Sequence, residues 1–96
     1  MKIESNISFI GSGAMATALI GGLIKKGVDP KYLYASDVKH EKCATLEKKF
    51  GIKTSTDNIE IIQDSEIVIL AVKPDSLKEA ALSIRNIIQS KGQIVI

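Results

Sequence analysis

The feature that most constrains the fold is a glycine-rich turn between a short apolar segment and an amphipathic helix. Residues 7–10 are apolar and β-prone, and Gly11-Ser12-Gly13 follows them directly. The next apolar residues recur with the spacing of one helical face: Ala16, Leu19, Ile20, Leu23 and Ile24. Because Gly27 ends this pattern, we expect a strand, a tight turn and a helix in immediate succession.

Two glycines lie inside the predicted helix. Gly21 and Gly22 should each cost up to about 1 kcal/mol relative to alanine at an interior helical position. The helix must therefore gain its stability from packing, and close approach to a neighbouring backbone is the expected compensation.

The same alternation of strand and helix patterns continues along the chain. Further strands are expected at 32–35, 52–54, 66–72 and 93–96. Further helices are expected at 39–50, at 57–63 with a capping box of Asp57 and Glu60, and from a cap at Asp75 to Gly92. After Glu66 the run at 66–72 is apolar to its end at Val72, as a strand covered on both faces should be. The pattern predicts an α/β fold: a Rossmann-type open parallel sheet with helices on both faces.

Composition places the chain among ordinary globular domains. The 96 residues suffice for one domain, residues 1–96, with 45% hydrophobic and 25% charged residues. A net charge of +2 with scattered lysines argues against a nucleic-acid partner, and the absence of a long apolar run argues against a membrane. The lone Cys43 forms no internal disulfide and no signal peptide is visible, so we expect a cytoplasmic protein. Because an apolar segment ends at Ile96 with nothing to cover it, we expect a fragment of a longer protein.

The glycine turn also carries chemistry, since 11–16 reads G-x-G-x-x-A between a strand and a helix. Gly11 would permit the tight turn, Gly13 would let a pyrophosphate approach the backbone, and Ala16 would allow close packing of helix and strand. The phosphates would then bind the free N–H groups at the helix N-terminus. The alternative is a glycine turn that merely joins the two elements, and the flanking pattern favours dinucleotide binding.

The end of the second predicted strand bears on the choice of cofactor. Ser36 and Asp37 lie about twenty residues beyond the motif, at the position that meets the adenosine ribose. A carboxylate there favours NADH, whereas Ser36, Lys39 and His40 could bind the 2′-phosphate of NADPH. A third reading makes Asp37 the cap of the next helix. These residues leave the choice between NADPH and NADH open.

Three segments together resemble one family. FIGSGAMATALIGGL, the pair Asp57-Asn58 and LAVKPD are similar to the amino-terminal domain of pyrroline-5-carboxylate reductase, the last enzyme of proline biosynthesis. The resemblance covers essentially the whole chain. AVKP at the end of the fourth predicted strand, where open α/β sheets bind ligands, separates this family from other dehydrogenases.

The resemblance implies a set of cofactor-binding residues. Residues 10–15 would hold the pyrophosphate, 36 and 37 would meet the ribose or its phosphate, 58 would lie along the adenosine, and 71–74 would line the path to the nicotinamide. In full, these residues are Ile10, Gly11, Ser12, Gly13, Ala14, Met15, Ser36, Asp37, Asn58, Ala71, Val72, Lys73 and Pro74.

The resemblance further implies an NAD(P)H-dependent oxidoreductase that reduces the C=N bond of 1-pyrroline-5-carboxylate by hydride transfer, giving proline. In the family a helical carboxy-terminal domain supplies the substrate pocket and the dimer interface. We therefore expect no catalytic residue within 1–96, inactivity of this chain alone, and a homo-oligomeric full-length enzyme. The alternatives are the cofactor domain of a hydroxyacid-type or prephenate-type dehydrogenase, or a non-catalytic nucleotide-sensing module.

Several other chemically active side chains indicate ordinary structural roles. His40 is the only histidine, and one histidine is not enough to build a metal cluster or a catalytic triad around. Cys43 lies on an apolar helical stripe and reads as a core residue. The carboxylates between residues 57 and 66 are spaced as helix caps and strand ends, so we expect no metal site. Lys73 reads as a cofactor-facing or structural residue rather than a general acid.

Overall fold

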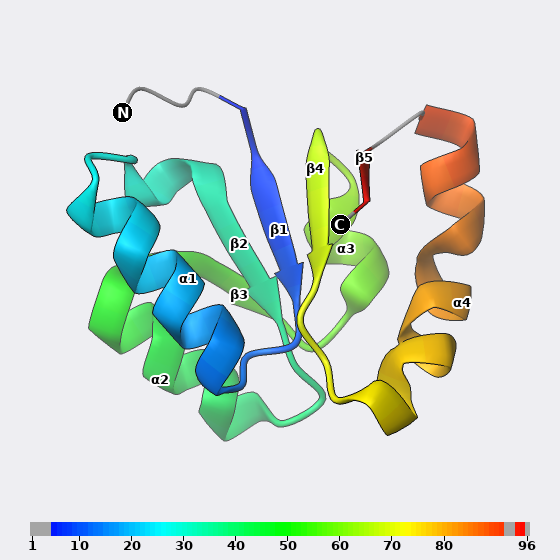
Figure 1. The fold of residues 1–96 in the computed structure, drawn as a ribbon, viewed down its shortest axis with the longest axis horizontal. Coiled ribbons are helices and arrows are strands. Elements are labelled where there is room, and N and C mark those ends of the chain that lie inside the picture. The colour runs from blue at the N-terminus through cyan, green and yellow to red at the C-terminus, as the bar shows by residue number, and fades with distance from the viewer. Residues whose placement is uncertain (1–4, 92–93, 96) are drawn as a thin grey trace.

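The computed structural model describes residues 5–91 and 94–95, in which five strands alternate with four α-helices (Figure 1). The elements are β1 (Ile7–Ile10), α1 (Ala14–Lys25), β2 (Leu33–Ser36), α2 (His40–Phe50), β3 (Lys53–Ser55), α3 (Asn58–Ile62), β4 (Ile67–Leu70), α4 (Pro74–Lys91) and β5 (Ile94–Val95). All strand pairs are parallel, in the order β3-β2-β1-β4-β5. The predicted Rossmann-type α/β fold is confirmed.

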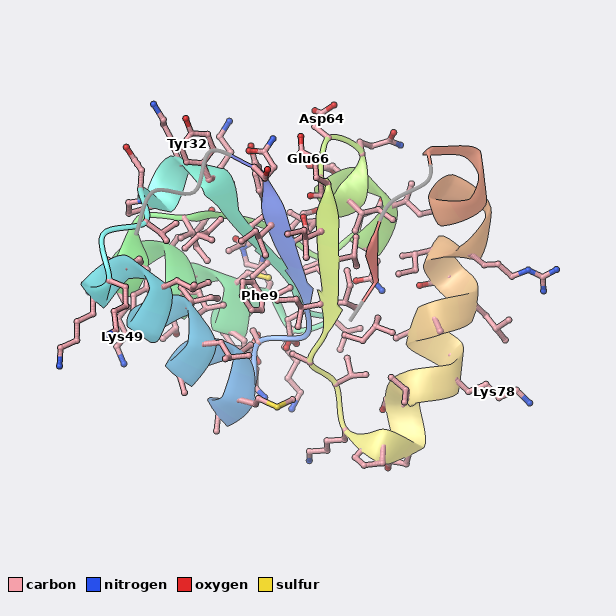
Figure 2. The ribbon with its side chains drawn as sticks, turned by 45° about the horizontal axis from the view of Figure 1, so that its top comes forward. Phe9, Tyr32, Lys49, Asp64, Glu66 and Lys78 are labelled. Atoms are coloured by element: carbon pink, nitrogen blue, oxygen red, sulfur yellow. The ribbon has the colours of Figure 1, made fainter. Side chains whose placement is uncertain are left out.

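Helices cover both faces of the sheet because successive side chains of each strand point to opposite faces. From β1, Ile7 and Phe9 enter the core formed with α1 and α2, and Phe9 lies at its centre in Figure 2. Ile10 enters the second core, formed with α3 and α4. The central strand is thus buried on both sides. Within the described residues, no helix is long and apolar enough to cross a bilayer.

The predicted element boundaries were partly wrong. Tyr32 belongs to a single 3-10 turn at Pro30–Tyr32, which Asp29 caps by accepting from the Lys31 N–H at 3.0 Å, and the strand begins only at Leu33. Asp75 lies within the first turn of α4 instead of capping it, because that helix begins at Pro74, as proline at a first helical position allows. The expected stop at Gly92 and the ends of the expected strand at 93 and 96 fall outside the described residues.

Half of the expected capping box at α3 is also wrong. The Asp57 carboxylate accepts from the Ile59 N–H at 2.9 Å, as predicted for an N-cap. The Asp57 N–H donates to Ser55 Oγ at 3.0 Å, so a hydroxyl of the preceding strand takes the place expected for Glu60. A short link between β3 and α3 brings the serine close enough to do this.

The buried face of α1 is narrower than the apolar pattern at 16–24 suggested, and the buried face of α4 is similarly narrow. Ala16 and Ile20 are fully buried, but Leu19 is 43% exposed because it lies about 100° around the helix from Ile20. On α4, Leu77 is exposed to the same extent, 43%, while Ile84 is fully buried. A helix lying on a sheet buries the residues that face the strands, and these leucines lie at the side of that face.

The two glycines inside α1 do not approach another backbone, contrary to expectation. A Cβ on Gly21 would lie 3.5 Å from the Phe50 ring, an ordinary contact, and a Cβ on Gly22 would meet nothing within 4 Å in the described part of the chain. We therefore expect Gly22→Ala to stabilise the fold by up to about 1 kcal/mol, because alanine loses less conformational entropy in a helix. Thermal unfolding should show a rise in Tm of a few degrees. An unchanged or lower Tm would contradict this interpretation.

Candidate functional site

A groove of about 550 Å³ lies at the carboxyl ends of β1, β2 and β4. In Figure 1 this is the lower edge of the sheet, where β1 runs through a loop into α1 and β4 runs into α4. The described residues that line it are Ile10, Gly11, Ser12, Gly13, Ser36, Asp37, Val38, Lys39, Lys42, Asn58, Ala71, Val72, Lys73, Ser76, Glu79, Ala80 and Ser83. Open parallel sheets bind ligands at this edge.

Gly11 is required by the backbone of the loop. Its φ of +103° lies in a region that side-chain-bearing residues rarely adopt, and a Cβ there would lie 2.6 Å from the carbonyl oxygen of Ala71. The Gly11 N–H donates to the Ser36 carbonyl at 2.8 Å, and the Ala71 N–H donates to the Ile10 carbonyl at 2.8 Å. The loop is therefore tied to the ends of both neighbouring strands.

Gly13, by contrast, is not required by the protein itself. Its φ of −74° is ordinary, and a Cβ would meet no atom of the described residues within 4 Å. It precedes the first turn of α1, which is fully described, receives no side-chain cap and carries no acidic residue. The positive end of that helix dipole thus faces open space, an arrangement suited to a pyrophosphate. The residues present fit a dinucleotide at this point.

Asp37 follows β2 and is bound to the glycine loop. Its Oδ2 accepts from the Ser12 hydroxyl at 2.5 Å and the Ser12 N–H at 3.2 Å, and its Oδ1 accepts from the Lys39 N–H at 2.9 Å. Partial burial acts to raise the pKa of Asp37, but the hydrogen bonds from Ser12 and Lys39 and the charge of Lys42 outweigh it and lower that pKa below its ordinary value of 3.8. The alternative in which Asp37 caps α2 is wrong, because the N-cap position is Lys39.

The lowered pKa of Asp37 predicts a loss of stability in acid. The ionised carboxylate contributes stability that is fully present above 3.8 and is lost as the pH falls through the lower pKa of the folded state. We expect Asp37→Asn to be less stable than the native chain near neutral pH, with the difference shrinking as the pH falls below about 4. Urea unfolding across this range measures it. A difference that stays constant with pH would contradict the prediction.

A second hydrogen-bonded chain crosses the groove from β2 to α4. The Ser36 hydroxyl is fully buried and donates to Asn58 Oδ1 at 2.5 Å. Asn58 Nδ2 donates to Ser83 Oγ at 3.2 Å, and that hydroxyl donates to the Ala80 carbonyl at 2.6 Å. These bonds fix the Asn58 amide in one orientation. Ser36 lines the groove while its hydroxyl is engaged with Asn58.

The structure brings most of the predicted cofactor residues together. Ten of the thirteen line the groove. Ala14 lines a smaller hollow of about 290 Å³ between α1 and α2, which shares Ser12, Gly13 and Lys42 with the groove. Two described residues, Met15 and Pro74, lie outside the groove lining, and Met15 is 56% exposed on α1.

Several lining residues were missed from the sequence, and one group carried a signal. Four groove residues of α4 recur at the spacing i, i+3, i+4, i+7: Ser76, Glu79, Ala80 and Ser83. Ala80 also belongs to the buried core, whereas Ser76, Glu79 and Ser83 form a polar stripe beside it, which a pattern of apolar residues does not reveal. Lys42 was not predicted as a groove residue, because its position beside the groove depends on the orientation of α2 relative to the sheet.

The other side chains singled out from the sequence have structural contacts or lie on the surface. His40 begins α2 and is exposed, and the buried Cys43 donates its S–H to the carbonyls of Asp37 and Ser55. Asp64 and Glu66 lie at the opposite edge of the sheet (Figure 2). Among the described residues, no group of three or more His, Cys, Asp and Glu is placed to hold a metal ion.

Comparison with known proteins agrees with this geometry. The family described as NADP oxidoreductase, coenzyme F420-dependent, matches residues 6–96. The chain is 43% identical over 93 residues to a pyrroline-5-carboxylate reductase of Methanosarcina acetivorans, covering 96% of this chain and 34% of that protein. It is 32% identical over 94 residues to the Escherichia coli enzyme of the same name, covering 97% of this chain and 35% of the enzyme.

Solved structures are also similar. A pyrroline-5-carboxylate reductase from Coxiella burnetii superposes with a TM-score of 0.92 at 32% identity, covering 97% of this chain and 34% of that one. The Plasmodium falciparum pyrroline carboxylate reductase with NADP bound has a TM-score of 0.77 at 23% identity, with 97% and 33% covered, and shows the shared fold. The chain spans about a third of the length of these relatives.

Proposed function

Because this chain belongs to the family of coenzyme F420-dependent NADP oxidoreductases, we propose that residues 1–96 form the dinucleotide-binding domain of a pyrroline-5-carboxylate reductase. The single observation that supports this most strongly is the pair of glycines in the loop after β1. Gly11 is required by the backbone, whereas Gly13 leaves a space in front of the uncapped α1 N-terminus that none of the residues in the described part of the chain fills. A bound pyrophosphate explains that space.

Each end of the groove would hold one part of NADPH or NADH. Residues from Ile10 through Met15 would surround the pyrophosphate, although Met15 would act only through its backbone because its side chain lies outside the groove. Ser36, Asp37 and Asn58 would meet the adenosine. The segment from Ala71 to Pro74 would line the path to the nicotinamide, with the side chain of Pro74 outside the groove.

When bound, the reduced nicotinamide would supply a hydride for the C=N carbon of 1-pyrroline-5-carboxylate, and with a proton taken up at the ring nitrogen the products would be proline and the oxidised cofactor. The described residues would bind and orient the cofactor. The substrate-binding groups would come from a further domain of the enzyme. That domain would also join copies of the enzyme into a homo-oligomer. A reduced cofactor and a single unpaired cysteine favour the cytoplasm as the site of action.

Cofactor binding is tested by titrating the protein with NADPH and with NADH, following the fluorescence of the reduced nicotinamide. We expect saturable binding of at least one of them. Circular dichroism recorded on the same sample establishes that the chain is folded. If the chain is folded and neither cofactor binds at about 1 mM, a free energy of binding weaker than about −4 kcal/mol, the proposed function is wrong.

The reaction is tested separately with the protein translated from the complete reading frame. We expect NAD(P)H oxidation with 1-pyrroline-5-carboxylate and none with prephenate or a 3-hydroxyacid. The reverse preference would assign the domain to another dehydrogenase. Binding of the cofactor without turnover of any of these substrates would favour a nucleotide-sensing module.

A further inference from the structure

The contact between Ser12 and Asp37 joins two parts of the groove that are 25 residues apart in the chain. Ser12 is the middle residue of the glycine loop and is 8% exposed. Its hydroxyl and its N–H both donate to the same carboxylate oxygen of Asp37. The hydrogen bond from the hydroxyl depends on the side chain at the position between the two glycines, so the glycines themselves do not explain it.

This contact limits what the Asp37 carboxylate can do toward a ligand. A carboxylate offers about four acceptor positions. Three are taken by the Ser12 hydroxyl, the Ser12 N–H and the Lys39 N–H. A carboxylate that selects NADH accepts hydrogen bonds from the ribose and repels a 2′-phosphate. With one position left, Asp37 cannot accept from both ribose hydroxyls while the Ser12 hydroxyl is in place.

The charges around Asp37 act in the same direction. Lys42 is close enough to stabilise the ionised carboxylate, and both Lys39 and Lys42 line this part of the groove. The lining here carries two lysines, Lys39 and Lys42, against the single carboxylate of Asp37, and this net positive charge favours a phosphate over a hydroxyl. Glu79, the other acidic residue of the lining, belongs to α4, across the groove.

We propose that Ser12 is a specificity-determining positioning residue: by holding the Asp37 carboxylate on the glycine loop, it makes the groove accept NADPH at least as well as NADH. This rests on the proposed function, since it concerns the same groove and the same cofactors. Ser12 acts through Asp37 and need not touch the ribose itself.

The test measures Kd for NADPH and for NADH with the native chain and with Ser12→Ala. Removing the hydroxyl frees Oδ2 to accept from the ribose. The ratio of the two Kd values should then shift about tenfold toward NADH, as expected for one hydrogen bond to a charged group. Ser12→Gly, which also lacks the hydroxyl, should give the same shift if the alanine variant fails to fold. Thr56→Ala, which removes an exposed hydroxyl outside the groove, should leave the ratio unchanged.

Two further measurements separate this role from a merely structural one. In an Asp37→Ala background, Ser12→Ala should no longer shift the ratio, because the residue it positions is absent. In the otherwise native chain, Ser12→Ala should raise the pKa of Asp37 measured by NMR titration. Equal weakening of both cofactors by Ser12→Ala, or a shift that persists without Asp37, would overturn the inference. Failure of the native chain to bind either cofactor would instead refute the proposed function.

Discussion

Gly11→Ala should destabilise the fold by about 3 kcal/mol or more, a large part of the 5–15 kcal/mol of a typical domain. Two costs add at this position. The backbone has a φ of +103°, and the new Cβ would lie 2.6 Å from the oxygen and 2.9 Å from the carbon of the Ala71 carbonyl. That carbonyl cannot move aside easily, because the Ala71 N–H is bonded to Ile10 at the end of the sheet. Urea or thermal unfolding measures the loss.

Gly51→Ala is the matched control for this prediction. Gly51 ends α2 with a φ of +72°, but a Cβ there would meet no atom within 4 Å among residues 5–91 and 94–95 as described. It should therefore cost only about 1–2 kcal/mol, the price of the left-handed backbone alone. If the two variants were equally destabilised, the close approach of the loop to β4 would not contribute to the cost at Gly11.

Gly13→Val should weaken NADPH and NADH binding by at least about 100-fold, or about 2.7 kcal/mol, while leaving the chain folded. The valine side chain would occupy the open space in front of the α1 N-terminus, which we assign to the pyrophosphate. Stability should fall by no more than about 1 kcal/mol, because valine is a poorer N-cap than glycine. Cofactor titration and urea unfolding of the same variant measure the two effects independently.

The control for Gly13→Val is Gly22→Ala, which also adds carbon at an open glycine of α1 but lies outside the groove. It should leave both Kd values unchanged. If Gly13→Val left the cofactor affinity unaltered, the assignment of the pyrophosphate to the glycine loop would be wrong. A loss of affinity accompanied by unfolding would mean that Gly13 has a structural role that its open surroundings do not reveal.

Most of the fold could be predicted because each element carries its own local pattern. The apolar run ending at Val72 and the 3.6-residue repeat before Gly51 need no knowledge of the rest of the chain. Exposure was harder to predict. Leu19 follows the same helical repeat as Ile20, and only the placement of α1 over the sheet decides that one is buried and the other is not.

The site divides in the same way. Gly11 and Gly13 could be found because the motif is continuous in sequence, and the strand ends at Ser36 and Ala71 because ligands bind at the carboxyl edge of such sheets. The bond between Ser12 and Asp37 and the chain from Ser36 through Asn58 depend on side chains that meet only after folding. No periodic pattern in the sequence predicts those side-chain contacts.

The strand pairing at the end of β1 determines the length of ligand that the groove can hold. Ile10 is in register with Ser36 on one side and with Leu70 on the other. Neighbouring strands lie about 4.8 Å apart, so roughly 10 Å separates the strand that would bind adenosine from the strand that would lead to the nicotinamide. Main-chain hydrogen bonds from Gly11 and Ala71 hold that interval. If the proposed site is right, side-chain substitutions would change which dinucleotide is preferred, while the distance between the two ends of the bound molecule would be set by the sheet itself.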